Sequence, residues 1–383
     1  MNHTPSPDKA ALEYSQKLIN LIKQQIDQKN NWISYVEYMQ MTLYTPKYGY
    51  YAGGSQKFGG VGDFITAPEL TPLFGQTLAG QLIELLPQTA GNIYEFGAGT
   101  GLLAATVLNT LTENQFNNYY IIELSADLIN RQQQTIHTLA PHLIHKVRHL
   151  SKLPTSFDGI LIGNEVLDAM PVPVYQRLGS EVVEMGVSWQ DDGFVWQQKT
   201  VKDLMIRQQV LETFPNTNTP YQSELHPQQY AFISTLAQKL QRGAMIWIDY
   251  GFDAAQYYHP QRQQGTIIGH HRHHVIHDVF FRPGLTDLTA HVNFTRIADA
   301  GIDNKLDLVG YTNQSTFLLN LNITQLLQQT GQPDSPSYIA AASACHTLLA
   351  PHEMGELFKV IAFGKKIDTD WLGFRHGDLC CKL

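Results

Sequence analysis

The stretch IYEFGAGTGLLAATVL, residues 93–108, decides the fold class of this chain. An apolar run ends in three alternate glycines, Gly97, Gly99 and Gly101, and a helix-forming segment follows. This order is typical of nucleotide-binding α/β folds, because residues that lack a Cβ atom let the backbone approach a ligand closely. The identity of that ligand decides whether the chain transfers hydrides, transfers methyl groups or only keeps the fold.

The residues around the glycines favour a methyl donor over a dinucleotide. A dinucleotide fingerprint that starts at Gly97 requires Gly or Ala where this chain has Leu102. Glu95 would repel a pyrophosphate, whereas it suits the ammonium and sulfonium groups of S-adenosylmethionine. Glu123 ends the next predicted strand, where a carboxylate can accept hydrogen bonds from both ribose hydroxyls. We therefore predict an S-adenosylmethionine site at Glu95, Gly97, Gly99, Gly101 and Glu123; the alternative is an unrelated α/β protein with turn glycines and surface acids.

Strands and helices alternate on both sides of this stretch. The strands are apolar with little alternation, as expected when helices cover both faces of a parallel sheet. We therefore expect a doubly wound, Rossmann-like α/β core. The predicted strands are residues 93–99, 118–125, 145–150, 158–171 (apolar until Asn164) and 243–252, with helices at 100–111 and 126–139 and a late edge strand at 358–365.

Other segments surround this core. Residues 8–28 have the spacing of an amphipathic helix, and a Gly- and Tyr-rich loop at 44–65 precedes a helix on which Thr66 and Glu69 have capping-box spacing. Two alternating strands joined by Asp-Asp-Gly predict a β-hairpin between 172 and 200. The expected organisation is a helical N-terminal part with a lid loop (1–90), a donor-binding core (91–171), a β-rich insertion (172–240) and the rest of the core with an irregular His- and Gly-rich segment (241–383).

Composition restricts the class of protein. The chain has 383 residues, is 43% hydrophobic and 16% charged, and carries a formal net charge of -8, which disfavours nucleic acid as a partner. Its three cysteines form no C-x-x-C pair and fit a reducing compartment. No signal-peptide pattern or apolar run of about 20 residues occurs. We expect a cytoplasmic protein without membrane insertion, and the apolar strands of the insertion make a homodimer conceivable.

The segment GNEVLDAMP, residues 163–171, is the candidate for acceptor chemistry. Asn164, Glu165 and Asp168 follow an apolar strand, and carboxylates there can clamp a guanidinium through paired hydrogen bonds. The alternative is a helix N-terminus with Asn164 as its cap and the two acids in the first turn. His291, close to Asp287 in sequence, can act as a base or orient substrate, or it is a partly buried structural histidine.

The histidine-rich stretch GHHRHHVIHD, residues 269–278, gives no metal prediction. Neither an acid nor a Cys pattern of a known zinc site accompanies its histidines. We predict a solvated loop and no metal site.

Taken together, the motifs resemble those of the MidA-like methyltransferases, a family that includes a mitochondrial arginine methyltransferase involved in complex I assembly. The resemblance runs in order from about residue 32 to the C-terminus. It rests on GDFITAPELTPLFG (62–75), YEFGAGTG (94–101), GNEVLDAMPV (163–172), IDYG (248–251), PGLTDLTAHVNF (283–294), MGELFKV (354–360) and WLGFRHGDL (371–379).

The resemblance implies a seven-stranded class I methyltransferase core with S-adenosylmethionine as donor. Asp63, Phe64, Thr66 and Pro68 would close over the donor, while Gly97, Gly99 and Glu123 would lie in its site. Asn164, Glu165 and Asp168 would face the acceptor, with Asp287 and His291 nearby. The family usually has an aromatic residue where this chain has His270, and basic residues where Cys380 and Cys381 follow GDL, so the substrate side departs from the family pattern.

Three functional hypotheses follow. The first is a protein arginine methyltransferase, with a respiratory-complex subunit as a possible substrate. The second is an assembly or scaffold protein that binds the donor without relevant turnover. The third is a small-molecule N- or O-methyltransferase.

Overall fold

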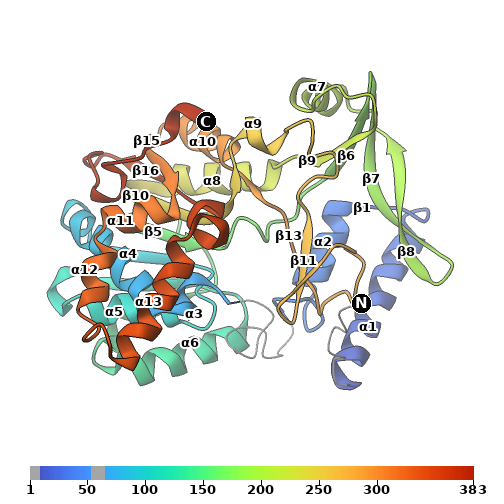
Figure 1. Cartoon of the computed structure of the whole chain (residues 1–383). Helices are drawn as coiled ribbons and strands as arrows, with labels where there is room; N and C mark the ends of the chain where they lie inside the picture. Colours follow the sequence, from blue (N-terminus) through green and yellow to red (C-terminus); the bar gives the residue numbers. More distant parts are fainter. Residues whose placement is uncertain (1–8, 53–64) are drawn as a thin grey trace. The chain divides into compact units, whose positions relative to one another are not determined.

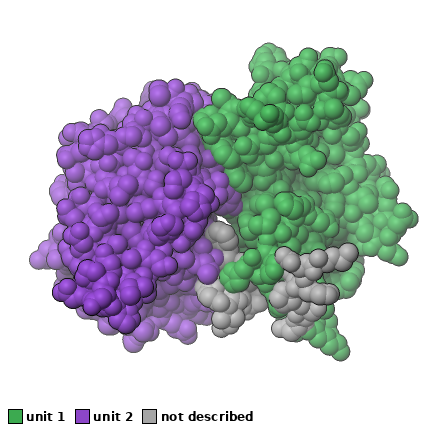
Figure 2. Space-filling model, viewed as in Figure 1, with its two compact units in different colours: residues 1–64, 168–229, 252–293 green, residues 65–167, 230–251, 294–383 purple. Residues whose placement is uncertain are grey.

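The computed structural model describes residues 9–52 and 65–383 and forms two compact units. Figure 2 shows them in green (unit 1; residues 1–64, 168–229 and 252–293) and purple (unit 2; residues 65–167, 230–251 and 294–383). Each unit is assembled from segments far apart in sequence. The predicted N-terminal part, residues 1–90, contributes to both.

Unit 2 contains the predicted α/β core. Its sheet follows the order β15 (Asp307–Asn313), β16 (Phe358–Lys365), β10 (Leu240–Phe252), β5 (Phe157–Asn164), β2 (Asn92–Phe96), β3 (Asn118–Ile122) and β4 (Val147–Leu150). The strands from β10 to β4 pair in parallel, and β16 pairs antiparallel with both β10 and β15. The predicted doubly wound α/β fold class is confirmed.

One strand prediction was wrong. β16 is not an edge strand, because it lies between β10 and β15, and β15 ends the sheet. The physical reason is burial on both faces: every residue of β16 except the last is buried. The apolar run VIAF, residues 360–363, indicates an interior strand.

Helices cover both faces of this sheet (Figure 1). One face packs against α4 and α5 in a single apolar core that contains Phe74, Leu103 and Ile160. On the other face, Phe232 of α8 contacts Phe96 and Trp247 edge-on. The helices of this unit are α3 (Ala67–Leu70), α4 (Pro72–Leu85), α5 (Leu102–Thr110), α6 (Ala126–Leu139), α8 (Pro227–Lys239), α10 (Phe294–Asp303), α11 (Gln314–Asn320), α12 (Ile323–Gln328) and α13 (Pro336–Leu349).

The predicted capping box at Thr66 and Glu69 is also wrong. The Thr66 side chain makes no capping hydrogen bond, and α3 ends after one turn. Thr71 is extended because a residue before proline, here Pro72, avoids the helical region. Thr71 then caps α4 by accepting a hydrogen bond from the Leu73 amide.

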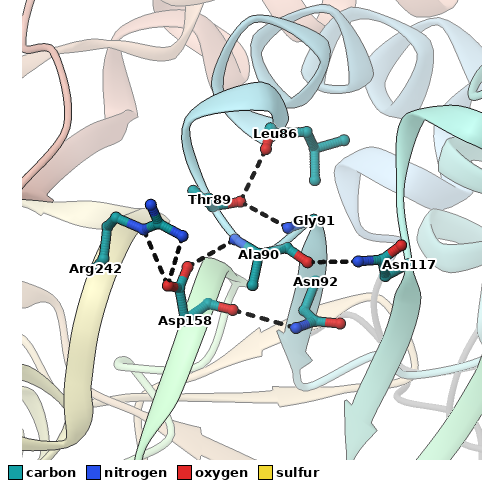
Figure 3. A network of polar contacts seen from close by, with 8 residues as sticks. All are labelled: Leu86, Thr89, Ala90, Gly91, Asn92, Asn117, Asp158 and Arg242. Atoms are coloured by element: carbon teal, nitrogen blue, oxygen red, sulfur yellow. Dashed lines mark hydrogen bonds and ion pairs between the residues drawn. The ribbon is translucent and has the colours of Figure 1, made fainter.

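A polar network connects the amino ends of β2, β5 and β10 (Figure 3). The glycine loop follows the opposite, carboxyl end of β2. Asp158, at the start of β5, accepts hydrogen bonds from the Ala90 amide at 2.7 Å and from Arg242 of β10 at 2.9 Å. Asn117 donates to the Ala90 carbonyl at 2.8 Å, and Asn92 donates to the Asp158 carbonyl. These bonds connect β2, β5 and β10 at the edge where no ligand is expected.

Unit 1 is mainly antiparallel. One sheet has the order β1-β7-β6-β9 with β8 paired to β7, and the other has the order β12-β11-β13. The predicted hairpin is confirmed, because Asp191 and Asp192 both have positive φ between β7 and β8, as a tight hairpin turn requires. The elements are α1 (Lys9–Gln28), β1 (Ile33–Ser34), α2 (Tyr35–Tyr44), β6 (Val174–Leu178), β7 (Glu181–Gln190), β8 (Gly193–Thr200), α7 (Leu204–Thr213), β9 (Tyr221–Glu224), α9 (Ala254–Tyr257), β11 (Ile268–His271), β12 (His274–Ile276), β13 (Asp287–Thr289) and β14 (Val292–Asn293).

The predicted N-terminal helix is confirmed as α1, and its buried face, with Leu18, Ile22 and Ile26, joins a core with α2 and β7. Across residues 9–52 and 65–383, no helix has the length and apolarity needed to cross a membrane.

Candidate functional site

The three glycines of the loop after β2 have positive φ, but their surroundings differ. A Cβ at Gly97 would lie 2.7 Å from the Val166 side chain, and one at Gly101 would lie 3.0 Å from the Gln132 Cα, so these two glycines permit close packing. A Cβ at Gly99 would meet no atom of the described chain within 4 Å. Gly99 therefore faces open space, where a ligand can approach the backbone.

Glu95 lies beneath this loop and not on its surface. Its side chain is 1% exposed and accepts a hydrogen bond from the Tyr119 hydroxyl at 2.8 Å. Burial raises the pKa of Glu95 to about 7, and the Tyr119 hydrogen bond opposes that rise. A direct contact between Glu95 and an ammonium group stays a prediction.

Glu123 follows β3, and its own turn holds its carboxylate. Oε1 accepts hydrogen bonds from the Leu124 and Ser125 amides, both at 2.8 Å. Oε2 accepts one from Gln132 of α6 at 3.3 Å, and the same Gln132 amide group donates to the Gly99 carbonyl at 3.1 Å. Sequence reasoning missed Gln132, although its four-residue spacing from Ile136 is a signal of the buried helix face.

Of the predicted lid residues, Asp63 and Phe64 lie outside the described residues. Thr66 and Pro68 lie at the start of α3 and are partly exposed. Glu69 of the same helix accepts a hydrogen bond from the Thr100 hydroxyl. This bond connects α3 directly to the glycine loop.

The end of β5 carries a strained residue. Glu165 has φ of 54°, which is uncommon outside glycine and occurs often at functional sites. Asn164 is 8% exposed; its Nδ2 donates to Glu165 Oε1 at 3.1 Å, and its Oδ1 has no hydrogen-bond partner within the described chain. Residues 165–170 form turns, so the alternative of a helix capped by Asn164 is wrong.

Asp249 of β10 braces this turn and was not predicted as a site residue. It is 1% exposed, and its Oδ2 accepts hydrogen bonds from the Val166 and Leu167 amides at 3.1 and 2.9 Å. The backbone at Glu165 also donates to the Ile248 carbonyl at 2.9 Å. The only sequence signal was the motif IDYG, which gave no role for the aspartate.

Asp168 belongs to unit 1, together with Asp287. The Tyr51 hydroxyl donates to both Asp287 oxygens at 2.9 and 3.1 Å, and the Tyr44 and Tyr51 rings stack with centroids 5.6 Å apart. Burial, followed by the charges of Asp287 and Asp168, raises the pKa of both tyrosines well above its usual value. Two carboxylates and two aromatic rings therefore share one region of unit 1.

His291 is also in unit 1 and is held by its neighbours. Its ring stacks on Phe252 with an interplanar angle of 8°, and its backbone amide donates to the Thr266 hydroxyl at 3.1 Å. That hydroxyl belongs to a buried network in which Tyr257 and the Thr266 amide donate to Glu224. Burial raises the pKa of Glu224 above its ordinary range.

The prediction of a solvated loop at the histidine-rich stretch is wrong, because these residues form the β11–β12 hairpin and His271 is buried. His271 bonds through Nδ1 to the Leu285 carbonyl, and His274 bonds to the Arg272 carbonyl within the turn. In the part of the chain that the structure describes, no three His, Cys, Asp or Glu side chains gather as metal ligands would.

Similar proteins carry arginine methyltransferase names. The chain is 26% identical to "Protein arginine methyltransferase NDUFAF7 homolog, mitochondrial" of Caenorhabditis elegans over 78% of this chain and 74% of that protein. It is also 26% identical to "Protein arginine methyltransferase NDUFAF7, mitochondrial" of Homo sapiens over 86% of this chain and 79% of that protein.

A solved structure is much more similar. A crystal structure of a superfamily member from Burkholderia thailandensis, bound to S-adenosyl-homocysteine, is 41% identical to this chain. It matches with a TM-score of 0.95 and covers 99% of this chain and 100% of its own.

Residues 77–312 match a family model of S-adenosyl-L-methionine-dependent methyltransferases. The geometry fits this donor: Gly99 leaves open space beside the backbone, and Glu123 offers a fixed carboxylate beyond the carboxyl ends of the strands. The cofactor is S-adenosylmethionine, and the chain belongs to the MidA-like family of S-adenosyl-L-methionine-dependent methyltransferases.

Proposed function

We propose that this methyltransferase modifies arginine side chains of a protein substrate. The observation that carries the proposal is the strained Glu165, whose carboxylate is held by Asn164 at the carboxyl end of β5. Strained conformations persist only where the surrounding structure imposes them, and the two amides bound by Asp249 impose this one. The names of the relatives support arginine as the acceptor.

A guanidinium acceptor needs carboxylates. When bound, S-adenosylmethionine supplies an electrophilic methyl group. A guanidinium is a poor nucleophile because its charge is delocalised, and a carboxylate that accepts two of its N–H groups fixes its plane and polarises it toward the remaining nitrogen. We assign this clamping role to Glu165, and we expect the Asn164 Oδ1 to accept a further N–H group.

The methylated nitrogen must then lose a proton. A base within hydrogen-bond reach of that nitrogen can accept it, and Glu165 is not that base because it holds the other nitrogens. The role of His291 as a base stays a prediction. The stack on Phe252 restricts the plane of the His291 ring.

Unit 1 has independent features that suit a cationic acceptor. Asp168 and Asp287 concentrate negative charge beside the stacked rings of Tyr44 and Tyr51. Aromatic faces and carboxylates both attract a guanidinium, whereas they would repel a phosphorylated or acidic substrate. We infer that these residues give unit 1, taken by itself, an affinity for cationic side chains of a protein substrate.

The test is a methylation assay with donor that carries a radiolabelled methyl group. Purified protein is incubated with extract from cells that lack it, labelled proteins are hydrolysed, and their methylated amino acids are separated. A subunit of a respiratory complex is the first substrate to examine. We expect label in methylarginine.

The variant Glu165→Gln should lower turnover on the order of 10²-fold, because it removes the clamping charge. Its affinity for S-adenosylhomocysteine should change less than twofold. Asp192→Asn is the matched control, because it also removes an acidic charge at a residue with positive φ, in the β7–β8 turn. Label on a small metabolite, or donor binding without any labelled product, would contradict the proposal and favour a small-molecule methyltransferase or a scaffold.

A further inference from the structure

We propose that Gln132 is a positioning residue that fixes the glycine loop and the Glu123 carboxylate relative to each other. Its side chain is 0% exposed and extends from α6 to both parts of the donor site. Nε2 donates to the Gly99 carbonyl at 3.1 Å and to Glu123 Oε2 at 3.3 Å. One amide group therefore connects the loop that leaves space for the donor with the acid that ends β3.

The Gly99 carbonyl and the Glu123 carboxylate set the orientation of this amide, and His149 of β4 supports it from the other side. His149 Nε2 lies 3.1 Å from Gln132 Oε1, so the oxygen of the amide points at the histidine and the nitrogen points at the donor site. A reversed amide would place its oxygen against the Gly99 carbonyl and the Glu123 carboxylate. The neutral histidine must therefore carry its proton on Nε2, and burial, which lowers the pKa of His149, favours the neutral form.

The contact with Gln132 also determines what Glu123 can offer a ligand. A carboxylate has about four acceptor positions. Within the described chain, the Leu124 and Ser125 amides use two on Oε1, and Gln132 uses one on Oε2. One position on Oε2 is left for a ribose hydroxyl, and the Gln132 bond fixes where it points.

Packing alone does not require glutamine at this position. A buried amide carries a desolvation cost that a leucine of similar size does not, so its hydrogen bonds must serve a purpose. The neighbouring Gln133 and Gln134 are exposed, and the buried Ile136 already anchors α6. Gln132 thus differs from its neighbours by its hydrogen bonds to the donor site. The inference depends on the donor and not on the identity of the acceptor.

The experiment compares Gln132→Leu with Gln133→Leu, which makes the same change at an exposed position of the same helix. Affinity for S-adenosylhomocysteine is measured by calorimetry. Hydrogen bonds to a charged group justify an expected loss of about tenfold or more for Gln132→Leu. Gln133→Leu should bind like the unchanged protein.

A second readout separates positioning from stability. Adenosine should bind the unchanged protein more tightly than one of its two analogues, 2′-deoxyadenosine or 3′-deoxyadenosine, namely the one that lacks the hydroxyl bound by Glu123. This preference should shrink in Gln132→Leu because Glu123 is no longer held. Equal affinity and an unchanged preference in Gln132→Leu would overturn the proposal. If circular dichroism shows that Gln132→Leu is unfolded, the same measurements are made on His149→Leu. We expect His149→Leu to lose less donor affinity and less ribose preference than a folded Gln132→Leu would. Unchanged affinity and preference in His149→Leu would overturn the proposal.

Discussion

At the scale of single residues, Gly99 is the glycine of the loop whose missing Cβ leaves room for a ligand and not for a neighbouring side chain. The other two glycines of the loop allow Val166 and Gln132 to pack closely, whereas Gly99 faces open space. A side chain at Gly99 would occupy the volume beside the donor without displacing any described part of the protein.

We predict that Gly99→Ala lowers donor affinity at least about tenfold while the protein stays folded. The positive φ of 51° adds a conformational cost on the order of 1 kcal/mol for alanine. Gly179→Ala is the matched control, because Gly179 has φ of 59° and also has open space around its Cβ position, but lies in the β6–β7 turn. Calorimetric titration with S-adenosylhomocysteine and urea unfolding of both variants check the prediction; equal donor affinity in the two would contradict it.

At the scale of elements, β10 determines the conformation of the turn after β5. Asp249 receives the Val166 and Leu167 amides and so connects two neighbouring strand ends. This support explains how Glu165 keeps a conformation that costs about 1–3 kcal/mol.

We predict that Asp249→Asn loosens this turn. Oδ2 accepts the Val166 and Leu167 amides and Oδ1 accepts the Tyr250 amide, so an asparagine must place its NH₂ group against a backbone donor on one side. Hydrogen exchange of residues 163–170 should become faster, and turnover should fall while the KM for the donor stays nearly unchanged. The control is Asp253→Asn, because Asp253 is also buried and also accepts a backbone amide, at the start of α9. Unchanged hydrogen exchange of residues 163–170 in Asp249→Asn would show that the turn after β5 does not depend on the hydrogen bonds to Asp249.

The elements could be predicted from sequence where local signals were strong. The apolar runs identified the parallel strands, and Asp191-Asp192-Gly193 identified the hairpin, because both signals depend on neighbouring residues only. Whether β15 or β16 lies at the edge of the sheet depends on which of the two apolar strands is covered on both sides. The position of β16 near the end of the chain gave no information about its place in the sheet.

In the candidate site, too, the residues that follow a local sequence pattern could be predicted, whereas those that act through distant contacts could not. The glycines and Glu123 follow a local pattern of strand, loop and helix. Gln132 lies within three consecutive glutamines, and Asp249 acts on a turn that is 83 positions away in sequence. Hydrogen bonds between distant segments are tertiary properties, and a single sequence does not reveal them.

At the scale of the whole molecule, the buried Glu95 links the stability of unit 2 to pH. In the folded chain its pKa is raised by burial to about 7, whereas an ordinary glutamate titrates near 4.5. Between these pH values the folded state binds more protons than the unfolded state. The free energy of unfolding therefore falls as pH rises through this window, and the loss is complete above pH 7.

We predict that Glu95→Gln removes this loss. The gap between the two pKa values corresponds to at most about 3 kcal/mol, so the variant should gain up to that amount over the unchanged protein at pH 8 and almost none at pH 4. The amide oxygen of glutamine can still accept the Tyr119 hydroxyl, so the hydrogen bond survives the change. Urea unfolding at several pH values, followed by hydrogen exchange of β2 and β3, measures the difference within unit 2.

Glu356→Gln controls for the loss of one negative charge, because Glu356 is exposed in the same unit. A stability gain for Glu95→Gln that does not depend on pH would contradict the prediction, because it would mean that the pKa of Glu95 is the same in the folded and unfolded states. A pH-dependent gain accompanied by weaker binding of S-adenosylhomocysteine would instead show why a costly buried acid is kept: the donor site needs its carboxylate beneath the glycine loop.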